Sequence, residues 1–376
     1  MNTQPSTHPR SSTPTQHPID QRAGGAAITA TMEAVAQYRF GAPADVLTLR
    51  DLPTPKPGPG EVLVDVAAAS VNALDWHYAT GEPMFARIAL GWRRPKREVA
   101  GTDLAGTVVA VGEGVTAWHV GDEVFGCADD GGAFARYAVV AEGALARRPQ
   151  AVDLQASAAL GVAAVTALQA VRDWGRLAEG QSVLVNGASG GVGTYAVQIA
   201  RALGAGHVTA VCSTRNVDQA RELGADDVID YTRTPLGTAG SRGSAGGGAR
   251  GSGDGPARRY DVFIDNAGST SLRQAREMLT HTGRFVMVTS RKSRWLHPMP
   301  RMMAGPFVFM GGTRTASIGQ VSETRLSDLE LLARWADEGL IRPVIEARLP
   351  LSEAPAAVER QGHGHARAKT LLLPDR

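Results

Sequence analysis

Five short apolar runs alternate with helical patterns between Gln181 and Ser290, and this rhythm constrains the fold more than any other feature. The runs are QSVLVNG, VTAVCS, DDVID, YDVFIDNAG and RFVMVTS, and segments such as TYAVQIARALGA separate them. Strands that are apolar on successive residues must be covered on both faces, and a strand–helix–strand rhythm makes them parallel. The sequence therefore predicts an α/β domain with a doubly wound parallel sheet.

The preceding residues follow a different pattern. From Met32 to about Glu142, β-branched runs such as EVLVDVAAASV and AGTVVAVGEGV are separated by turns rich in Gly and Pro. This spacing predicts a compact β-rich domain of barrel or sandwich type. Asp153 then precedes an Ala-rich stretch ending at Gly175, which predicts a capped helix.

A length of 376 residues favours two domains with extra segments. Residues 1–31 contain mainly Ser, Thr, Pro and Gln, so we expect a disordered tail. The expected divisions are a β-rich domain at 32–152, a parallel-sheet domain at 153–312 and a C-terminal segment at 313–376. Within the second domain, Gly237–Gly255 holds nine glycines and is interpreted as a flexible insertion, although its arginines could instead contact an anionic ligand.

Composition excludes several classes of protein. The 39 basic and 37 acidic residues give a net charge of +2, which predicts neither a nucleic-acid nor a membrane partner. Cys127 and Cys212 are too few for a disulfide framework or a cysteine-rich zinc site, and we expect inert buried thiols. No apolar run approaches the ~18 residues of a membrane span, and the N-terminus lacks the apolar core of a secretory signal. A cytoplasmic protein is expected.

The run Ala188–Gly193 (ASGGVG) links a predicted strand to a predicted helix. It matches the dinucleotide fingerprint G-x-G-x-x-G, with Ala188 in place of the first glycine. Gly190 would let the backbone approach a pyrophosphate, and Gly193 would allow close helix–strand packing. Ser189, Gly191 and Val192 complete the turn, whose N–H groups would face the phosphates at the positive end of the helix dipole. The sequence thus predicts a Rossmann domain that binds a dinucleotide.

The end of the next strand indicates the cofactor. A fingerprint that binds NAD has Asp or Glu about 20 residues further on, whereas this stretch reads Cys212-Ser213-Thr214-Arg215-Asn216. Arg215 could form charge-assisted bonds to a 2′-phosphate. NADPH is therefore favoured over NADH, the alternative being that Arg215 is a solvated surface residue.

From Met32 to Leu373 the chain resembles the medium-chain dehydrogenase/reductase superfamily, and within it the zinc-independent quinone oxidoreductases related to zeta-crystallin. The carrying motifs include GTDLAGTVVAVGEGVTAWHVGDEVFG, LVNGASGGVGTYAVQIARALGA, LGADDVIDY and the ending GHGHARAKTLLL. The resemblance implies a GroES-like catalytic domain, a Rossmann domain and a C-terminus that returns to the catalytic domain. The active site would lie between the two domains.

The resemblance also implies site residues on the catalytic side. Asn72 stands where zinc-dependent relatives place a metal-binding cysteine, and Gly101-Thr102-Asp103 replaces their Gly-His-Glu. A zinc site of His77, His119 and Asp75 fits no ligand spacing. In the quinone reductases, the positions of Asn72, Asp75 and His77 line the substrate pocket. The alternative for Asn72 and Asp75 is that they bond to local backbone.

On the cofactor side, the resemblance implies Thr166 at the nicotinamide-phosphate end and Asn266 near the nicotinamide ribose. Ser213 and Arg215 would contact the 2′-phosphate, and Tyr231 the adenosine. Lys369 occupies the lysine of a Gly-Lys ending, although Ala368 replaces the glycine.

We therefore expect an NADPH-dependent reductase of quinones or α,β-unsaturated carbonyls, in which the cofactor supplies the hydride. One alternative is an alcohol or aldehyde dehydrogenase with the same cofactor, which the missing zinc ligands disfavour. Another is an NADPH-binding sensor or partner protein without turnover. Family analogy suggests a homodimer.

Overall fold

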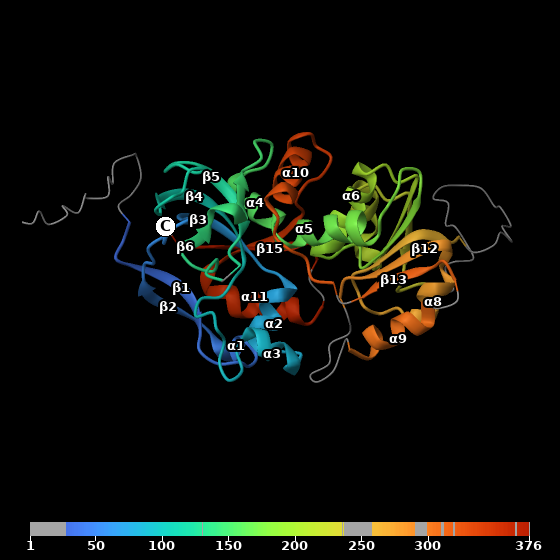
Figure 1. Ribbon diagram of the computed structural model, residues 1–376, viewed down its shortest axis with the longest axis horizontal. Coiled ribbons are helices and arrows are strands. Elements are labelled where there is room, and N and C mark those ends of the chain that lie inside the picture. Colours follow the sequence, from blue (N-terminus) through green and yellow to red (C-terminus); the bar gives the residue numbers. More distant parts are fainter. Residues whose placement is uncertain are drawn as a thin grey trace, which may run out of the picture.

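The computed structural model describes residues 28–129, 131–234, 236, 258–289, 299–309, 312–318, 320–364 and 367–375. Residues 1–27 of the expected tail and the whole Gly237–Gly255 insertion lie outside these ranges. The described chain forms two halves that lie side by side (Figure 1). The first strand begins at Thr31, beside the Met32 at which apolar patterning was expected to start.

The half containing the glycine turn is built on a six-stranded sheet, and every pairing in it is parallel, as predicted. The strand order is β10-β9-β8-β11-β12-β13. In chain order these strands are β8 (Ser182–Asn186), β9 (His207–Cys212), β10 (Asp227–Asp230), β11 (Tyr260–Asp265), β12 (Leu279–Met287) and β13 (Thr315–Ile318).

Alternate strand residues pack on opposite faces of this sheet. Val183 and Val185 of β8 join a core cluster with helices α5 (Val162–Gln169) and α6 (Gly191–Ala202). Leu184, between them, joins a second cluster with α8 (Leu272–Glu277) and α9 (Met299–Phe309). Helices therefore cover both faces, which is why these strands are apolar on successive residues.

The other half is built on a seven-stranded sheet in the order β14-β15-β3-β4-β5-β7, with β6 also paired to β3. The last strand in chain order, β15 (Lys369–Leu373), lies between β14 and β3. The C-terminal segment therefore returns to the sheet formed by the first half of the chain. The remaining strands are β3 (Glu61–Ser70), β4 (Asp103–Val111), β5 (Glu123–Cys127), β6 (Tyr137–Ala141), β7 (Leu145–Arg147) and β14 (Ile345–Pro350), and β1 (Thr31–Gln37) and β2 (Leu47–Pro53) form a separate antiparallel pair.

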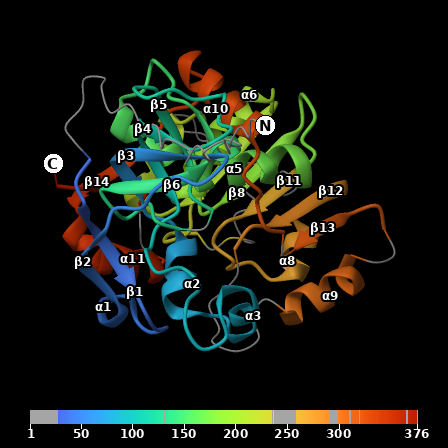
Figure 2. The same cartoon turned by 60° about the vertical axis from the view of Figure 1, so that its left-hand side comes forward.

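The helices beside this second sheet are α1 (Pro43–Val46), α2 (Ala73–Thr80), α3 (Arg87–Leu90), α4 (Leu154–Ser157), α10 (Leu326–Asp337) and α11 (Ala354–Gly362). Helices α2 and α11 pack against each other, with α1 and α3 on the same side of the molecule (Figure 2). Helix α7 (Val217–Glu222) instead packs against β9 and β10 of the six-stranded sheet.

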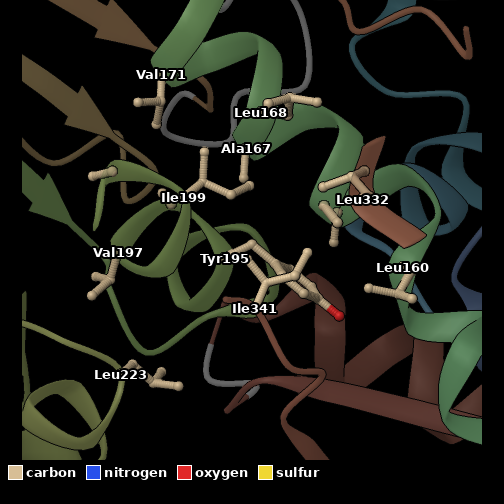
Figure 3. Packing of buried hydrophobic residues seen from close by; sticks show 14 of the residues in the cluster. Leu160, Ala167, Leu168, Val171, Tyr195, Val197, Ile199, Leu223, Leu332 and Ile341 are labelled. Carbon is tan, nitrogen blue, oxygen red and sulfur yellow. The ribbon is translucent and has the colours of Figure 1, made fainter. Parts of the chain in front are cut away.

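One buried cluster joins the halves. It contains Leu168 and Ile199 of the Rossmann side together with Ala105 and Phe125 of the seven-stranded sheet. Its packing around α5 and α6 is shown in Figure 3, where Tyr195 lies fully buried and donates its hydroxyl to the carbonyl of Ala159 at 3.0 Å. Because the two sheets share this core, the site between them is held by packed side chains.

The helical stretch Leu154–Trp174 begins at Asp153, whose side chain accepts the N–H of Ala156 at 2.8 Å, and ends at Gly175. Its 21 residues meet the length and apolarity of a membrane-spanning helix, although no such span was expected from the sequence. However, 83% of its apolar window is buried inside the protein, as in the core helix of a folded domain.

Candidate functional site

The glycine turn joins the end of β8 to the start of α6, as predicted. Gly187 has a φ of 74°, a conformation that favours glycine. A Cβ on Gly193 would lie 2.1 Å from the carbonyl oxygen of Gly187, so this position has no room for a side chain. The first N–H groups of α6, which begins at Gly191, have no acceptor within the helix. The turn therefore has the close backbone approach and the free donors that a pyrophosphate needs.

The start of β15 lies against this turn. Ala368 donates its N–H to the carbonyl of Ser189 at 2.8 Å and forms a parallel bridge with Gly190. Its φ of 54° lies in the left-handed region, which favours glycine. Lys369 follows, and its Cδ would be 3.0 Å from a Cβ on Gly191.

Lys369 lies in a buried polar cluster beneath the turn. Its side chain is 2% exposed, and its Nζ donates to the Asn72 Oδ1 at 2.6 Å and to the carbonyl of Val71 at 3.0 Å. The carboxylate of Asp103, which is fully buried, lies 3.6 Å from the same Nζ. The structure thus brings Lys369 and Asn72 together, although the sequence placed one at the cofactor and the other at the substrate.

Asn72 is fully engaged by its neighbours. Its amide Nδ2 donates to Asp103 Oδ2 at 2.8 Å and to the carbonyl of Ser70 at 3.2 Å, which uses both hydrogens. Its backbone N–H donates to Asp75 Oδ2 at 2.7 Å, and Asn72 thereby caps α2. These contacts match the alternative in which Asn72 and Asp75 bond locally.

Asp103 connects four elements and was named in the sequence only as part of Gly-Thr-Asp. Its Oδ1 accepts the N–H of Val162 at 2.8 Å at the start of α5, while its Oδ2 faces Asn72 and Lys369. A Cβ on Gly161 would lie 2.3 Å from Oδ1, so a glycine is required there. The signal available in the sequence was the acidic residue retained where Gly-His-Glu has its glutamate.

Two carboxyls share one ammonium in this cluster. Burial raises the pKa of Asp75 to about 7, against the lowering effect of the Asn72 N–H, and the nearby Asp103 raises it further. Burial also raises the pKa of Asp103, opposed by Lys369, and lowers the pKa of Lys369, opposed by Asp103 and Asp75. Within the described chain, Asp75 Oδ1 is buried without a hydrogen-bond partner. Asp75 lines a cavity of about 440 Å³ together with Phe40, Tyr78 and Arg97.

Asp75→Asn should change how stability depends on pH. The folded-state pKa of Asp75 is about 7 and the ordinary value is 3.8, so between these pH values the folded state binds more protons than the unfolded state. The free energy of unfolding therefore falls as pH rises through this window, and the variant lacks that loss. Relative to the wild type, we expect the variant to gain about 2–4 kcal/mol between pH 4 and pH 8. Urea unfolding at both pH values measures it. Asp218→Asn, whose side chain is 92% exposed, is the control, and a parallel pH dependence of Asp75→Asn and the wild type would refute the assignment.

His77 lies on α2 outside the Asn72 contacts. Its Nδ1 is 2.7 Å from the carbonyl oxygen of Glu82, and its ring meets Trp76 edge-on. His119 is 82% exposed beside Asp122. Among the residues that the structure describes, no group of three or more His, Cys, Asp or Glu side chains is placed to hold a metal ion.

The predicted nicotinamide end lies where β8 and β11 finish side by side. Asn266 follows β11, and its N–H donates to the carbonyl of Asn186 at 3.0 Å. Both polar atoms of the Asn266 side chain are shielded from solvent and have no partner within the described chain. An orphaned amide costs free energy that a ribose hydroxyl could recover. The residues present therefore fit a dinucleotide at this edge.

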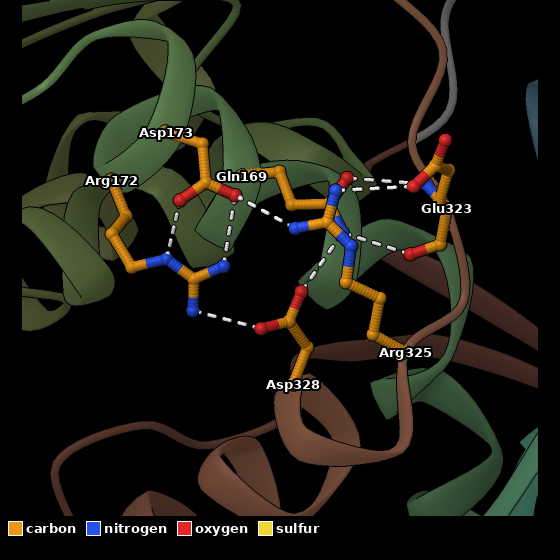
Figure 4. Close-up of polar contacts among 6 residues, drawn as sticks. All are labelled: Gln169, Arg172, Asp173, Glu323, Arg325 and Asp328. Carbon is orange, nitrogen blue, oxygen red and sulfur yellow. Dashed lines mark hydrogen bonds and ion pairs between the residues drawn. The ribbon is translucent and has the colours of Figure 1, made fainter.

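Thr166, the other residue predicted at the nicotinamide end, contacts the segment before α10. Its Oγ1 is 2.8 Å from Oγ of Ser322, which the sequence did not single out. The segment around Ser322 is fixed by the network in Figure 4, in which Gln169 accepts the N–H of Glu323 at 3.1 Å and donates to its carbonyl at 2.8 Å. Arg172 and Asp328 extend this network at 2.8 Å, which secures α10 to the α5 stretch.

At the predicted adenosine end, Ser213 and Arg215 follow β9. Ser213 Oγ accepts from Asn216 Nδ2 at 3.2 Å, and Tyr231, which is 55% exposed, donates its N–H to the carbonyl of Cys212 at 3.1 Å. These groups thus lie at one edge of the sheet, and their contacts with the 2′-phosphate and the adenosine stay predictions.

A carboxylate missed by the sequence lies at the same edge. Asp230 ends β10 and is paired in register with Cys212. The hydroxyls of Thr214 and Thr232 donate to it, and the Thr214 bond is the main cause of its lowered pKa. Both of its oxygens are thus occupied by protein donors.

A Rossmann sheet with a glycine turn, joined to a β-rich half through a shared core, is the architecture of a two-domain dinucleotide-binding protein. Two families match the chain. "Alcohol dehydrogenase GroES-like domain" matches residues 58–150, and "Zinc-binding dehydrogenase" matches residues 223–372.

Relatives that match over about nine tenths of the chain indicate the same kind of protein. The "Chloroplast envelope quinone oxidoreductase homolog" of Arabidopsis thaliana is 31% identical over 351 residues, covering 91% of this chain and 98% of that protein. The structure of the quinone oxidoreductase from Coxiella burnetii has a TM-score of 0.76 at 27% identity, covering 91% and 99% of the two chains. The crystal structure of an NAD-dependent alcohol dehydrogenase has a TM-score of 0.74 at 26% identity, covering 91% of this chain and 99% of that one.

The chain belongs to the medium-chain dehydrogenase/reductase superfamily, and it has quinone oxidoreductases among its relatives. The predicted family, and the predicted combination of a GroES-like domain with a Rossmann domain, are confirmed. The family implies a nicotinamide cofactor and a small-molecule substrate.

Proposed function

We propose that this protein transfers hydride from NADPH to quinones or α,β-unsaturated carbonyls without a metal ion, as a member of the zeta-crystallin-like branch. The observation that carries the proposal is the contact between Lys369 and Asn72. The position where zinc-dependent relatives have a cysteine ligand holds an amide, and a buried ammonium lies 2.6 Å from its oxygen. A fixed cation at this position disfavours a second cation such as Zn²⁺.

The acceptor chemistry agrees with a site of this kind. The bound nicotinamide supplies the hydride when the cofactor is present. Reduction of a quinone or enone leaves negative charge on a conjugated oxygen, and this delocalised charge needs less stabilisation than the alkoxide formed from a simple ketone. Hydrogen-bond donors and nearby positive charge can supply it. Lys369 contributes that charge from its buried position, through the Asn72 amide to which it donates.

The proposed roles follow the two faces of the site. Asn72, Asp75 and His77 form the acceptor side, where Asp75 can hold a proton near neutral pH. Because the Asn72 hydrogens are used, its role is to fix the wall of the pocket. On the cofactor side, the proposed contacts are the turn Ser189–Gly193 (with Gly190, Gly191 and Val192), Thr166, Asn266, Ser213, Arg215, Tyr231 and Lys369. The proposal also includes a domain boundary after residue 152. It further includes a homodimer and a cytoplasmic location.

An alcohol dehydrogenase is the second candidate, because one matched family is described as zinc-binding and one similar structure is titled as an alcohol dehydrogenase. A non-catalytic NADPH-binding protein is the third.

One assay separates the three candidates. The purified protein should oxidise NADPH with a panel of quinones and enones, more efficiently than NADH, at a rate that chelators leave unchanged. Elemental analysis should find no stoichiometric zinc. Turnover restricted to alcohols or aldehydes, together with bound zinc, would establish the dehydrogenase instead. NADPH binding without turnover of any acceptor would establish a binding protein.

A further inference from the structure

Three large apolar side chains project from the segment that follows α2. Ile88 is 74% exposed, Trp92 72% and Phe85 41%. Arg93, Arg94 and Lys96 lie between and beside them and are also exposed. We call these six residues the α3 patch. Free exposure of a tryptophan and an isoleucine beside three cations is unusual for a soluble surface.

Two arginines that flank the patch, Arg87 and Arg97, attach its segment to the body of the protein. Arg87 donates to the carbonyls of Gly81 at 3.2 Å and Thr80 at 3.1 Å, and its guanidinium lies 4.6 Å from the centre of the Phe40 ring. Arg97 lies 4.1 Å from the centre of the Tyr78 ring. These two cations are therefore engaged with the body of the protein, and they fix the two ends of the segment.

The cations of the patch are not neutralised internally. Within the part of the chain that the structure describes, Arg93, Arg94 and Lys96 form no ion pair. The segment 81–100 holds five basic and two acidic residues, although the whole chain is nearly neutral at +2. The small net charge of the whole chain, from which no membrane partner was predicted, therefore hides a local excess of positive charge in this segment.

Helix α9 adds a second exposed apolar group. Met303 is 70% exposed and Phe307 73%. Figures 1 and 2 both show α3 and α9 on the same lower side of the molecule, from the two halves of the fold. Two elements could thus meet one extended surface.

We propose that the α3 patch docks the protein on the surface of an anionic phospholipid bilayer. Tryptophan and isoleucine enter the interface between headgroups and acyl chains, while arginine and lysine pair with lipid phosphates. The apolar side chains protrude from a short turn, and none of them lines either of the two cavities described for this protein. Protrusion suits insertion into lipid better than a protein interface, whose strongest contacts fill pockets. The proposal does not rest on the acceptor chemistry, although Lys96 of the patch lines the same cavity as Asp75.

Vesicle sedimentation tests the proposal. The full-length protein should pellet with vesicles of phosphatidylcholine and phosphatidylglycerol, and not with phosphatidylcholine alone. High salt should release it, because surface charges are screened. Dibrominated phosphatidylglycerol should quench tryptophan fluorescence, and Trp92→Phe should abolish most of that quenching. Equal binding to neutral and anionic vesicles, or binding to neither, would overturn the proposal.

Variants locate the surface. Arg93→Glu with Arg94→Glu should weaken partitioning at least 25-fold, about fivefold for each charge. Trp92→Ser should weaken it at least tenfold. The matched controls are Arg273→Glu, 88% exposed on α8, and Val321→Ser, 83% exposed, and both should bind like the wild type. Equal losses in patch and control variants would refute the assignment. A change from dimer to monomer in Trp92→Ser, with unchanged vesicle binding, would identify the patch as a contact between copies.

These readouts need no turnover, so failure of the proposed function would leave them intact. The patch variants should also retain the NADPH affinity of the wild type, because none of the changed residues belongs to the proposed site. A variant that loses NADPH binding is misfolded, and Trp92→Phe then provides the less disruptive comparison.

Discussion

Asp103→Ala should lower the free energy of unfolding by about 3–5 kcal/mol. The substitution removes the carboxylate 3.6 Å from the Lys369 ammonium, which is 2% exposed and cannot reach water. It also removes the acceptor of the Asn72 amide and of the Val162 N–H. Urea unfolding followed by circular dichroism measures the change through the transition midpoint.

Two comparisons make this test specific. Asp218→Ala breaks a surface pair with Arg221, in which the two side chains are 92% and 51% exposed, and should cost less than about 1 kcal/mol. Combining Asp103→Ala with Lys369→Met removes both charges and should recover part of the loss. A cost for Asp103→Ala no larger than that of the surface pair would show that the buried cluster does not hold the two halves together.

Arg215→Ala should weaken NADPH binding about ten- to a hundredfold and leave NADH binding nearly unchanged, since one charge-assisted bond is worth about 1.5–3 kcal/mol. Arg215 follows β9, at the edge where Ser213 and Tyr231 also lie. Isothermal titration with each cofactor measures both affinities.

A second arginine near the same edge provides the control for this test. Arg221→Ala, on α7 and 51% exposed, removes a nearby cation outside the proposed site and should leave both affinities unchanged. Equal losses of NADPH and NADH in Arg215→Ala would mean that Arg215 supports the fold of this edge rather than the 2′-phosphate. A preference for NADH in the wild type would instead direct attention to Asp230.

The parallel sheet and the glycine turn were predictable because their signals are local. Apolar continuity in VLV or VFI and the spacing of Gly190 and Gly193 are set by residues a few positions apart. The family resemblance then added the return of the C-terminus, which β15 makes by pairing with β3.

The polar cluster could not be predicted in this way. Asn72, Asp103, Val162 and Lys369 come from four separate parts of the chain, and only the packed sheets bring them within hydrogen-bond distance. The same reason hid Asp230, which lies at the predicted adenosine edge because β10 is the neighbour of β9. The sequence supplied candidate residues for the site, and these stay predictions, whereas the hydrogen bonds among them depend on tertiary contacts.

The position of β15 also determines when the protein can finish folding. Strand β3 begins at Glu61, yet its neighbour on one side spans Lys369–Leu373, at the far end of the chain. On the ribosome, the six-stranded sheet is synthesised completely before this strand emerges. Until then, Asn72 and Asp103 have no ammonium to pair with. A chain that ends before Lys369 would therefore lack both this neighbour of β3 and the ammonium, and its seven-stranded sheet would stay incomplete.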